Sequence, residues 1–248
     1  MKLQNENFFY ERLEWDSKQL DLNCGLIGLR DASLDINQYE LADNVKKLIA
    51  ENRNADFITI KLPGDFPVVL DCLLKSSARF IETELIYIFN HISDDTVKHT
   101  VNFFDSFDPD VFIPLADEMI FSRFYMDDNI PQAKARNLWS DSIRNHCMGR
   151  ADRIAVVYLE TQPVGMATIN FINNENIALH IIGVLRPFQG HGLGCSLMSG
   201  ITREYGDKYK IFVETQSINK NAQRLYQRTG FFLDSMRYVL HVWPQRAK

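Results

Sequence analysis

The sequence has no long apolar run, and this absence narrows the class of protein. The longest unbroken apolar run is Ile154–Leu159, whereas a membrane-spanning helix needs about 20 such residues. The N-terminal segment MKLQNENFFYERLEW also lacks the apolar core and small-residue cleavage site of a signal peptide. We therefore expect a cytoplasmic protein that does not insert into a membrane.

The sequence also has no excess of positively charged residues. The chain has 27 Lys and Arg residues against 32 Asp and Glu residues, a formal net charge of −5, and no basic tract. Because binding along a phosphate backbone requires a basic face, we expect no nucleic-acid partner. A small anionic ligand needs only a few local donors, so a single pyrophosphate remains compatible with this charge balance.

The sequence also lacks paired cysteines and the usual spacings of metal ligands. The six histidines form no HxH or HExxH motif, and the cysteines form no CxxC motif. We therefore predict reduced thiols rather than a disulfide framework, and no metal site. The four dispersed cysteines are Cys24, Cys72, Cys147 and Cys195.

What the sequence does contain is an alternation of strand and helix patterns in two parts. A polar segment, His91–Asp110, separates the parts, and we place a domain boundary there. This predicts a smaller N-terminal α/β domain at residues 1–105 and a second domain at residues 106–248. The first domain is expected to contain strands at Cys24–Arg30, Asp56–Leu62 and Phe80–Phe89, and helices at Tyr39–Ala50 and Phe66–Ser77.

The second part begins with two expected helices, Pro109–Tyr125 and Pro131–Cys147. Its last hundred residues then follow the order β-β-β-α-β-α-β. This order predicts an α/β (α+β) fold with a mixed sheet, antiparallel first and then crossing over. The expected elements are strands Arg153–Leu159, Val164–Ile172 and Ile177–Leu185, helix Leu193–Tyr205, strand Lys210–Gln216, helix Lys220–Thr229 and strand Phe231–Val242.

A glycine-rich loop, Gln189–Gly194, follows the third of these strands and opens a helix. Such a loop exposes backbone N–H groups, and the helix N-terminus adds about half a positive charge, so together they suit a pyrophosphate. The spacing GxGxG, late in the chain, matches neither the Rossmann fingerprint nor a P-loop. Taken alone, the loop could equally be a turn that binds no ligand.

A second motif follows in residues 219–231, which read N-x-x-A-x-x-L-Y-x-x-x-G-F. The strand, the glycine loop, the helix and this motif together resemble the GNAT superfamily of acetyl-CoA-dependent N-acetyltransferases. The resemblance implies a mixed, centrally splayed β-sheet flanked by helices, acetyl-CoA as the cosubstrate and no metal. It also implies that the N-terminal domain resembles a partial GNAT domain.

The resemblance assigns roles to individual residues. The strand before the loop is expected to splay at His180–Val184, so that a backbone N–H near Gly183 or Val184 polarises the thioester carbonyl. Tyr226 matches the family's tyrosine, which protonates the departing thiolate. The acetyl-CoA-binding residues implied by position are Ile182, Gly183, Val184, Gln189, Gly190, His191, Gly192, Leu193, Gly194, Cys195 and Asn219.

The attacking amine must be neutral, so the reaction needs a base. Glu82 and Glu84 lie two residues apart in an expected strand, hence on the same face, although either could be a solvated carboxylate. A closer resemblance, to the TDP-fucosamine acetyltransferase subfamily, implies that Glu82 acts through ordered water, with Glu84 or solvent as alternatives. The segments that carry this resemblance are Glu11–Trp15, Phe80–Glu84, Phe121–Phe124 with Trp139, and Glu214–Gln216.

The same subfamily implies where the substrate binds. Arg123 would pair with the phosphate of a nucleotide sugar, and Phe124 would pack on the sugar or the base. Arg123 could instead be a surface or helix-end arginine. The chain departs from the subfamily at Asp94–Asp108 and Tyr125–Pro131, so the epimer and the position of the amine stay open.

The implied function is acetyl transfer, by direct attack, from acetyl-CoA to the amino group of a TDP-linked 4-amino-4,6-dideoxyhexose, for surface polysaccharide synthesis. One alternative is a GNAT enzyme for another amine: a peptide N-terminus, a polyamine or an antibiotic. A second is a non-catalytic acyl-CoA-binding module, against which the retention of Gln189–Gly194, Asn219 and Tyr226 argues. The sequence leaves the oligomeric state open, a homodimer included.

Overall fold

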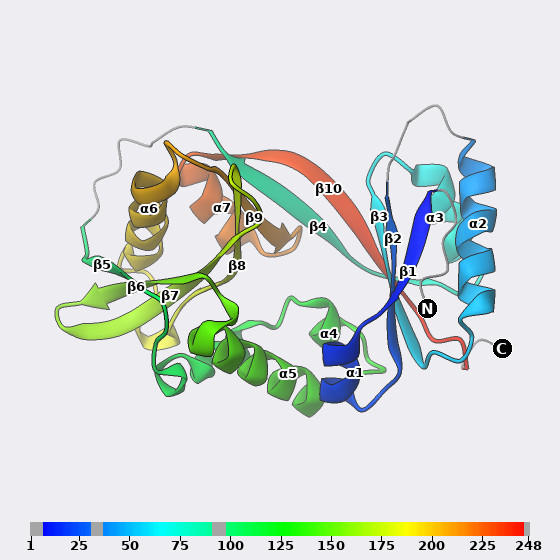
Figure 1. The fold of residues 1–248 in the computed structure, drawn as a ribbon, viewed down its shortest axis with the longest axis horizontal. Coiled ribbons are helices and arrows are strands. Elements are labelled where there is room, and N and C mark those ends of the chain that lie inside the picture. The colour runs from blue at the N-terminus through cyan, green and yellow to red at the C-terminus, as the bar shows by residue number, and fades with distance from the viewer. Residues whose placement is uncertain (1–6, 31–36, 91–97, 246–248) are drawn as a thin grey trace. The chain divides into compact units, whose positions relative to one another are not determined.

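The computed structural model describes residues 7–30, 37–90 and 98–245 (Figure 1). The strands are β1 (Phe8–Arg12), β2 (Cys24–Leu29), β3 (Phe57–Pro63), β4 (Arg79–Phe89), β5 (Val101–Phe104), β6 (Arg153–Leu159), β7 (Gln162–Phe171), β8 (Asn176–Val184), β9 (Lys210–Gln216) and β10 (Phe231–Val242). The helices are α1 (Glu14–Leu20), α2 (Gln38–Glu51), α3 (Pro67–Leu74), α4 (Arg123–Met126), α5 (Gln132–Asn145), α6 (Leu193–Tyr205) and α7 (Lys220–Arg228). Shorter turns are η1 (Pro109–Val111), η2 (Ile113–Glu118), η3 (His146–Arg150) and η4 (Arg186–Phe188).

The chain divides into two compact units, and neither is one continuous stretch. Unit 1 comprises Met1–Glu84, Met126–Lys134 and Ser235–Lys248, and unit 2 comprises Leu85–Tyr125 and Ala135–Asp234. Strands β4 and β10 therefore contribute residues to both units. A division into domains at residue 105 stays a prediction; the units differ from it because residues 85–105 group with unit 2, whereas 126–134 and 235–248 group with unit 1.

Unit 1 contains a small sheet with two helices on one face (Figure 1). β1 pairs antiparallel with β2, β2 pairs parallel with β3, and β3 pairs antiparallel with Arg237–Val242 of β10. α2 presents Leu41, Val45 and Leu48 to this sheet at helical spacing. These side chains and Val69 and Leu73 of α3 bury a continuous core against the strands.

A buried polar network ties Met126–Lys134 into unit 1. Asp127 is 0% exposed, and its Oδ2 accepts hydrogen bonds from His241 Nδ1 at 2.8 Å and Trp243 Nε1 at 2.9 Å. Its Oδ1 accepts the backbone N–H of Asn129 at 3.0 Å. Burial alone would raise the pKa of the Asp127 carboxyl, but these hydrogen bonds outweigh burial and hold the pKa well below its usual range.

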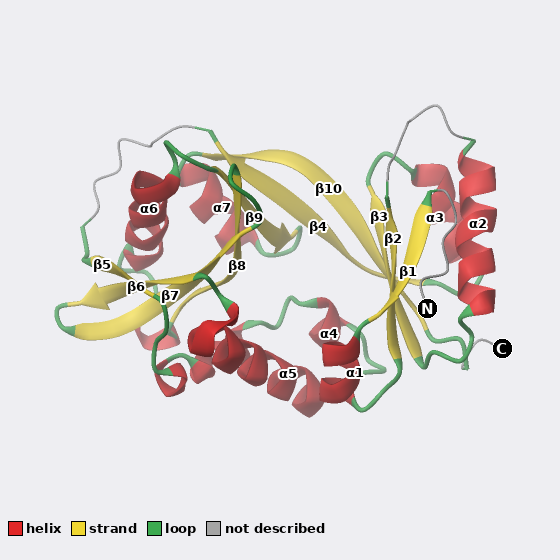
Figure 2. Cartoon of the chain, viewed as in Figure 1, coloured by secondary structure: helices red, strands yellow, loops and turns green. Residues whose placement is uncertain are grey.

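Unit 2 is built around a mixed sheet with helices on both faces (Figure 2). Its strand order is β4-β9-β8-β7-β6-β5; β5 to β8 pair antiparallel and β8 pairs parallel with β9. α6 and α7 share one core cluster with β6 to β9, while η2 and α5 form another with β6 to β8. This mixed sheet flanked by helices confirms the predicted fold class.

Several local predictions were wrong. Pro109–Tyr125 is not one helix: η1, η2 and α4 replace it, because Pro114 removes a backbone donor and its ring clashes with the preceding turn. The polar segment His91–Asp110 contains a strand, β5, which no pattern predicted; residues 91–97 of that segment lie outside the described residues. β1 and α1 were not predicted either. In the ranges that the structure describes, no helix is long and apolar enough to cross a bilayer.

Candidate active site

A cavity of about 500 Å³ opens beside the glycine loop within unit 2. Four parts of the fold form its walls: β8, the glycine loop with the start of α6, one side of α7, and the end of η2 with the segment after it. The lining residues are Glu118, Met119, Phe121, Ile182, Gly183, Val184, Phe188, Gln189, Gly190, Gly192, Leu193, Gly194, Leu197, Asn219, Asn221, Ala222, Leu225 and Tyr226.

A smaller cavity of about 100 Å³ shares walls with the first. The residues common to both are Glu118, Met119, Phe121, Ile182, Asn219 and Tyr226. The smaller cavity adds a polar set, namely Ser122, Trp139, His180, Glu214, Thr215 and Gln216. The pair therefore consists of a larger, more apolar part beside the glycines and a smaller, more polar part.

The cavities lie where β8 and β9 part. The parallel pairing of these strands ends at Leu179 opposite Val213, although β8 continues to Val184 and β9 to Gln216. The smaller cavity is lined by His180 and Glu214, the residues that follow the last pair. The mixed sheet is thus splayed at this point, as the sequence led us to expect.

The splay leaves backbone N–H groups of β8 pointing away from β7. Leu185 donates its N–H to Val164 O at 2.8 Å, and Ile181 donates to Thr168 Oγ1 at 3.0 Å, so both point toward β7. Because N–H directions alternate along a strand, those of Ile182 and Val184 point to the side where β9 has parted. The carbonyl of Val184, on the same side, accepts from Gln189 Nε2 at 3.0 Å.

The glycine loop has the geometry of an anion cradle. Gly190 and Gly192 have φ values of 84° and 78°, which L side chains rarely adopt, and a Cβ on either would meet nothing within 4 Å. Gly192 is the N-cap of α6, and no side chain caps this helix start. The backbone N–H groups at the start of α6 therefore suit the pyrophosphate of acetyl-CoA.

Two histidines hold the loop in shape. His191 Nδ1 donates to Phe188 O at 3.2 Å, and His99 Nε2 donates to the carbonyl of His191 at 3.1 Å. Neither His191 nor Cys195 lines the larger cavity, although both were predicted to bind the cofactor. The other predicted cofactor residues, from Ile182 to Gly194 and Asn219, all line it.

Tyr226 lies at the junction of the two cavities and is 4% exposed. Its ring packs edge-on against Tyr87, with centroids 5.7 Å apart, and beside Phe231 at 6.1 Å. Burial raises the pKa of Tyr226, and Tyr87 acts in the same direction. The phenol therefore keeps its proton throughout the neutral range.

Asn219 caps a helix in addition to lining both cavities. It is the N-cap of α7, and its Oδ1 accepts the backbone N–H of Ala222 at 3.2 Å. Gln223 Nε2 reinforces the same turn by donating to Ser217 O at 2.7 Å. Capping alone would account for an asparagine at this position, so contact with the cofactor arm stays a prediction.

The two candidate bases of the sequence belong to unit 1. Glu82 is 5% exposed and Glu84 is 6% exposed, both on β4. The carboxylate of Glu84 is held by Lys61 and Arg237, each at 3.0 Å. Glu82 lines neither of the two cavities, and its role as the base stays a prediction.

Arg123 and Phe124 lie at the start of α4. The guanidinium of Arg123 stacks on the Phe124 ring, with Cζ 4.1 Å from its centroid. Phe124 is 3% exposed, so its ring has little surface left for a ligand. Pairing of Arg123 with a phosphate, and packing of Phe124 on a sugar, stay predictions.

Sequence reasoning assigned no side-chain role to most residues of the smaller cavity, among them Glu118, Trp139, His180 and Glu214. Trp139 Nε1 donates to Ser122 Oγ at 2.9 Å, which fixes the indole in the wall. These residues come from η2, α5, β8 and β9, so only the folded chain brings them together. Trp139 and Glu214 had appeared in the sequence only as marks of resemblance.

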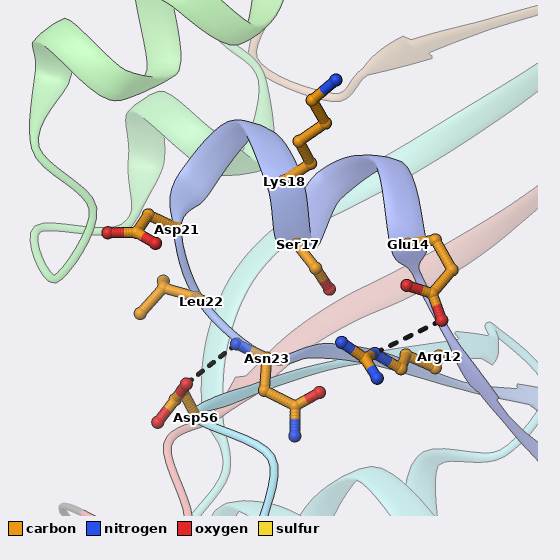
Figure 3. Close-up of a pocket in the computed structure, with 8 residues that line it drawn as sticks. All are labelled: Arg12, Glu14, Ser17, Lys18, Asp21, Leu22, Asn23 and Asp56. Atoms are coloured by element: carbon orange, nitrogen blue, oxygen red, sulfur yellow. Dashed lines mark hydrogen bonds and ion pairs between the residues drawn. The ribbon is translucent and has the colours of Figure 1, made fainter.

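A third hollow, of about 440 Å³, lies in unit 1 and has a different character. Two of its charged groups are paired, since Arg12 Nε lies 3.4 Å from Glu14 Oε1, and a third, Asp56, accepts the backbone N–H of Asn23 on Oδ2 at 2.8 Å (Figure 3). Lys18 points away from the others (Figure 3). No converging set of donors or acceptors is formed, and among the described residues no cluster of three or more His, Cys, Asp or Glu could hold a metal ion.

The part of the chain that forms this site resembles proteins of a known family. The model of the acetyltransferase (GNAT) family matches residues 118–231, which include the glycine loop and Tyr226. The spore coat polysaccharide biosynthesis protein SpsD of Bacillus subtilis (strain 168) is 22% identical over 246 residues, covering 95% of this chain and 83% of that protein.

Solved structures show the same fold over nearly the whole chain. A GCN5-related N-acetyltransferase from Kribbella flavida has a TM-score of 0.64 at 10% identity, covering 98% of this chain and 89% of that one. A functionally unknown conserved protein from Staphylococcus epidermidis ATCC 12228 has a TM-score of 0.65 at 16% identity, covering 97% and 92%.

Proposed function

The chain is an N-acetyltransferase with a GNAT-family domain at residues 118–231, and from this premise we propose that it acetylates the amino group of a TDP-linked 4-amino-4,6-dideoxyhexose. The observation that carries the proposal is the joined pair of cavities at the splay of β8 and β9. One part adjoins the uncapped start of α6, and the other has polar walls and an indole. An acyl-CoA and a polar acceptor can thus meet at Tyr226.

The proposed substrate class rests on two further supports. The related SpsD protein has a name that places it in polysaccharide biosynthesis. Trp139 and the carboxylates of Glu118 and Glu214 line the smaller cavity, and aromatic faces and carboxylates are chemical groups that bind sugar rings and hydroxyl groups.

In the proposed reaction, acetyl-CoA supplies an activated acetyl thioester, and the chain orients it. The N–H groups of Gly190–Gly194 bind the pyrophosphate, and the outward N–H of Val184 faces the thioester oxygen. A donor placed there stabilises the developing oxyanion more than the ground state, which lowers the barrier. The direction of the Val184 N–H favours it over the Gly183 N–H for this role.

Tyr226 completes the transfer by giving its proton to the departing sulfur. A phenol whose pKa is raised by burial is a weak acid. However, a thiolate that forms in the same desolvated cavity is also a stronger base than in water, so the transfer remains feasible. No acyl-enzyme is required, because the amine attacks the thioester directly.

The test is turnover of a defined panel of amines. Purified protein is incubated with acetyl-CoA and TDP-amino sugars that differ in epimer and amine position, and separately with polyamines and peptides. Release of free CoA and the mass of the product report the reaction. We expect N-acetylation of a TDP-4-amino-4,6-dideoxyhexose; turnover confined to peptides or polyamines would refute the sugar proposal.

A further inference from the structure

The smaller cavity contains a titratable group that the proposed reaction has not used. His180, on β8, lines this cavity together with Glu214 and Tyr226. It comes directly after Leu179, the last residue of β8 that pairs with β9, at the point where the pairing of β8 with β7 shifts register. His180 and the backbone N–H of Val184, which is assigned to the thioester oxygen, thus belong to the same splayed end of β8.

The surroundings of His180 favour the neutral form of its imidazole. Burial of the ring lowers the pKa of His180, Glu214 opposes this, and Arg150 adds to the lowering. His146 lies beside it, with ring centroids 6.1 Å apart, and the pKa of His146 is lowered by burial too. In the described part of the chain, neither ring nitrogen of His180 has a hydrogen-bond partner, so one nitrogen can accept a proton.

Two acidic residues lie in the wall of the same cavity. Glu118 from η2 and Glu214 from β9 both line it, and no Lys or Arg does. A sugar amine is largely protonated at neutral pH, and two carboxylates in a partly desolvated cleft favour the ammonium form. The substrate therefore arrives in the form that cannot attack, and a proton acceptor is needed where it binds.

We propose that His180 accepts the proton of the substrate's ammonium group, while Glu118 and Glu214 hold that group in the smaller cavity. This rests on the proposed acetyl transfer and names the proton acceptor for it. Val184 lies four residues along β8, roughly 13 Å away, so the proton passes through water held in the cavity. Glu82, the base implied by resemblance, does not line this cavity.

The proton balance is complete without another reactant. The ammonium gives one proton through water to His180, and the neutral amine then forms the C–N bond with the thioester carbon. The resulting tetrahedral adduct loses the second N–H proton, the C–S bond breaks, and sulfur takes the proton of Tyr226. The phenolate regains a proton from the adduct through water, and His180 releases its own to solvent, so one proton is released per turnover.

The test compares His180→Gln with Glu82→Gln across pH. If His180 is the acceptor, His180→Gln lowers kcat at pH 7 tenfold or more, and the deficit narrows as pH rises, because the amine then loses its proton to solvent. Added imidazole partly rescues His180→Ala, with a rate that follows the neutral form of imidazole. If Glu82 is the base instead, Glu82→Gln shows this pH-dependent loss of kcat and His180→Gln does not. Glu175→Gln, on the turn between β7 and β8, is the matched control for Glu214→Gln and stays at the wild-type rate.

Two outcomes would overturn the inference. One is an unchanged rate and pH profile in His180→Gln on whichever amine the wild type acetylates. The other comes from NMR titration of the His180 ring, which needs no turnover: we expect a pKa below about 6.5 that falls further in Glu214→Gln, and an ordinary pKa unaffected by that change would contradict us. Failure of the sugar proposal is separate, since it appears as wild-type turnover of other amines only.

Discussion

At the scale of single residues, Tyr226 combines a packing role with the role of proton donor proposed above. Its ring lies against Tyr87 and Phe231, and the residue also lines both cavities. We expect Tyr226→Phe to keep the ring packing and the affinity for acetyl-CoA while kcat falls tenfold or more, since only the proton donor is lost. Steady-state kinetics and calorimetric titration with CoA measure the two effects.

Tyr87→Phe is the matched control for that prediction. Tyr87 belongs to the same cluster and is 1% exposed, yet it lines neither cavity. Removing its hydroxyl should leave kcat near the wild-type value. Equal losses in both variants would mean that a disturbed core, rather than a missing proton, explains the effect at Tyr226.

Asp127, unlike Tyr226, has a structural role and no proposed chemical one. Asp127→Asn should lower the free energy of unfolding by about 3 to 5 kcal/mol, since a buried charge that serves four donors is replaced by an amide. A carboxyl whose pKa is lowered on folding stabilises the fold above about pH 4 and loses this contribution as pH falls further. Urea titrations should therefore show the full difference in unfolding free energy between wild type and variant at pH 7, and a smaller difference at pH 3.

The neighbouring carboxylate provides the control. Asp128 is 87% exposed and pairs with Arg79 at 2.9 Å. Asp128→Asn should cost less than about 1 kcal/mol, because exposed ion pairs contribute little. A large loss there, or a gap at Asp127 that widens in acid, would contradict the assignment.

At the scale of elements, Asn219 both caps the start of α7 and lines the larger cavity. Asn219→Asp keeps an acceptor for the Ala222 N–H but removes the amide donor and adds a negative charge. We expect this variant to retain its stability and lose affinity for acetyl-CoA. Asn219→Ala should lose both, with about 1 kcal/mol of stability from the missing cap. Full acetyl-CoA affinity in Asn219→Asp would show that the residue is a cap alone.

In the glycine loop, too, variants can distinguish a loss of stability caused by backbone strain from a loss of acetyl-CoA binding. Gly192 and Gly149 both have positive φ, 78° and 109°, and open space where a Cβ would stand. Alanine at either should cost about 1 kcal/mol of stability. Only Gly192→Ala should also weaken acetyl-CoA binding, because a methyl group there disturbs the approach to the N–H groups of α6. Equal acetyl-CoA affinities in the two variants would exclude the loop as the cradle.

Helices and strands with a clear local apolar pattern were predictable from the sequence. Elements that depend on contacts distant in the sequence were not. β6, α6, β9 and β10 begin and end where the apolar patterns placed them. β5 was missed because Val101–Phe104 is held by contacts distant in sequence. It pairs with β6 and packs on α6, where a Cβ on Gly200 would meet Val101 at 3.0 Å. The site divides in the same way: the glycine loop and Tyr226 follow from local motifs, while His180 and Glu118 meet only once β8 and β9 have parted.

At the scale of the whole molecule, the two units share strands, and this has a consequence for dissection of the chain. A cut at residue 105 would leave unit 2 without Leu85–Phe89, whose Tyr87 and Phe89 pack on Tyr226 and Phe231 at 5.7 and 5.4 Å. It would also expose the end of β10, where Leu240 and Val242 are 0% exposed and paired with β3 in the full chain.

We therefore expect the fragment 106–248 to fail as an independent domain, although it contains the whole glycine loop and Tyr226. Its thermal unfolding, followed by circular dichroism, should be broad or absent where the full chain unfolds cooperatively. Its affinity for CoA should fall well below that of the full chain, because the buried wall behind Tyr226 is missing. A fragment that unfolds in one sharp transition and binds CoA as the full chain does would show that the shared strands are dispensable, and that the boundary in the sequence is also a boundary in folding.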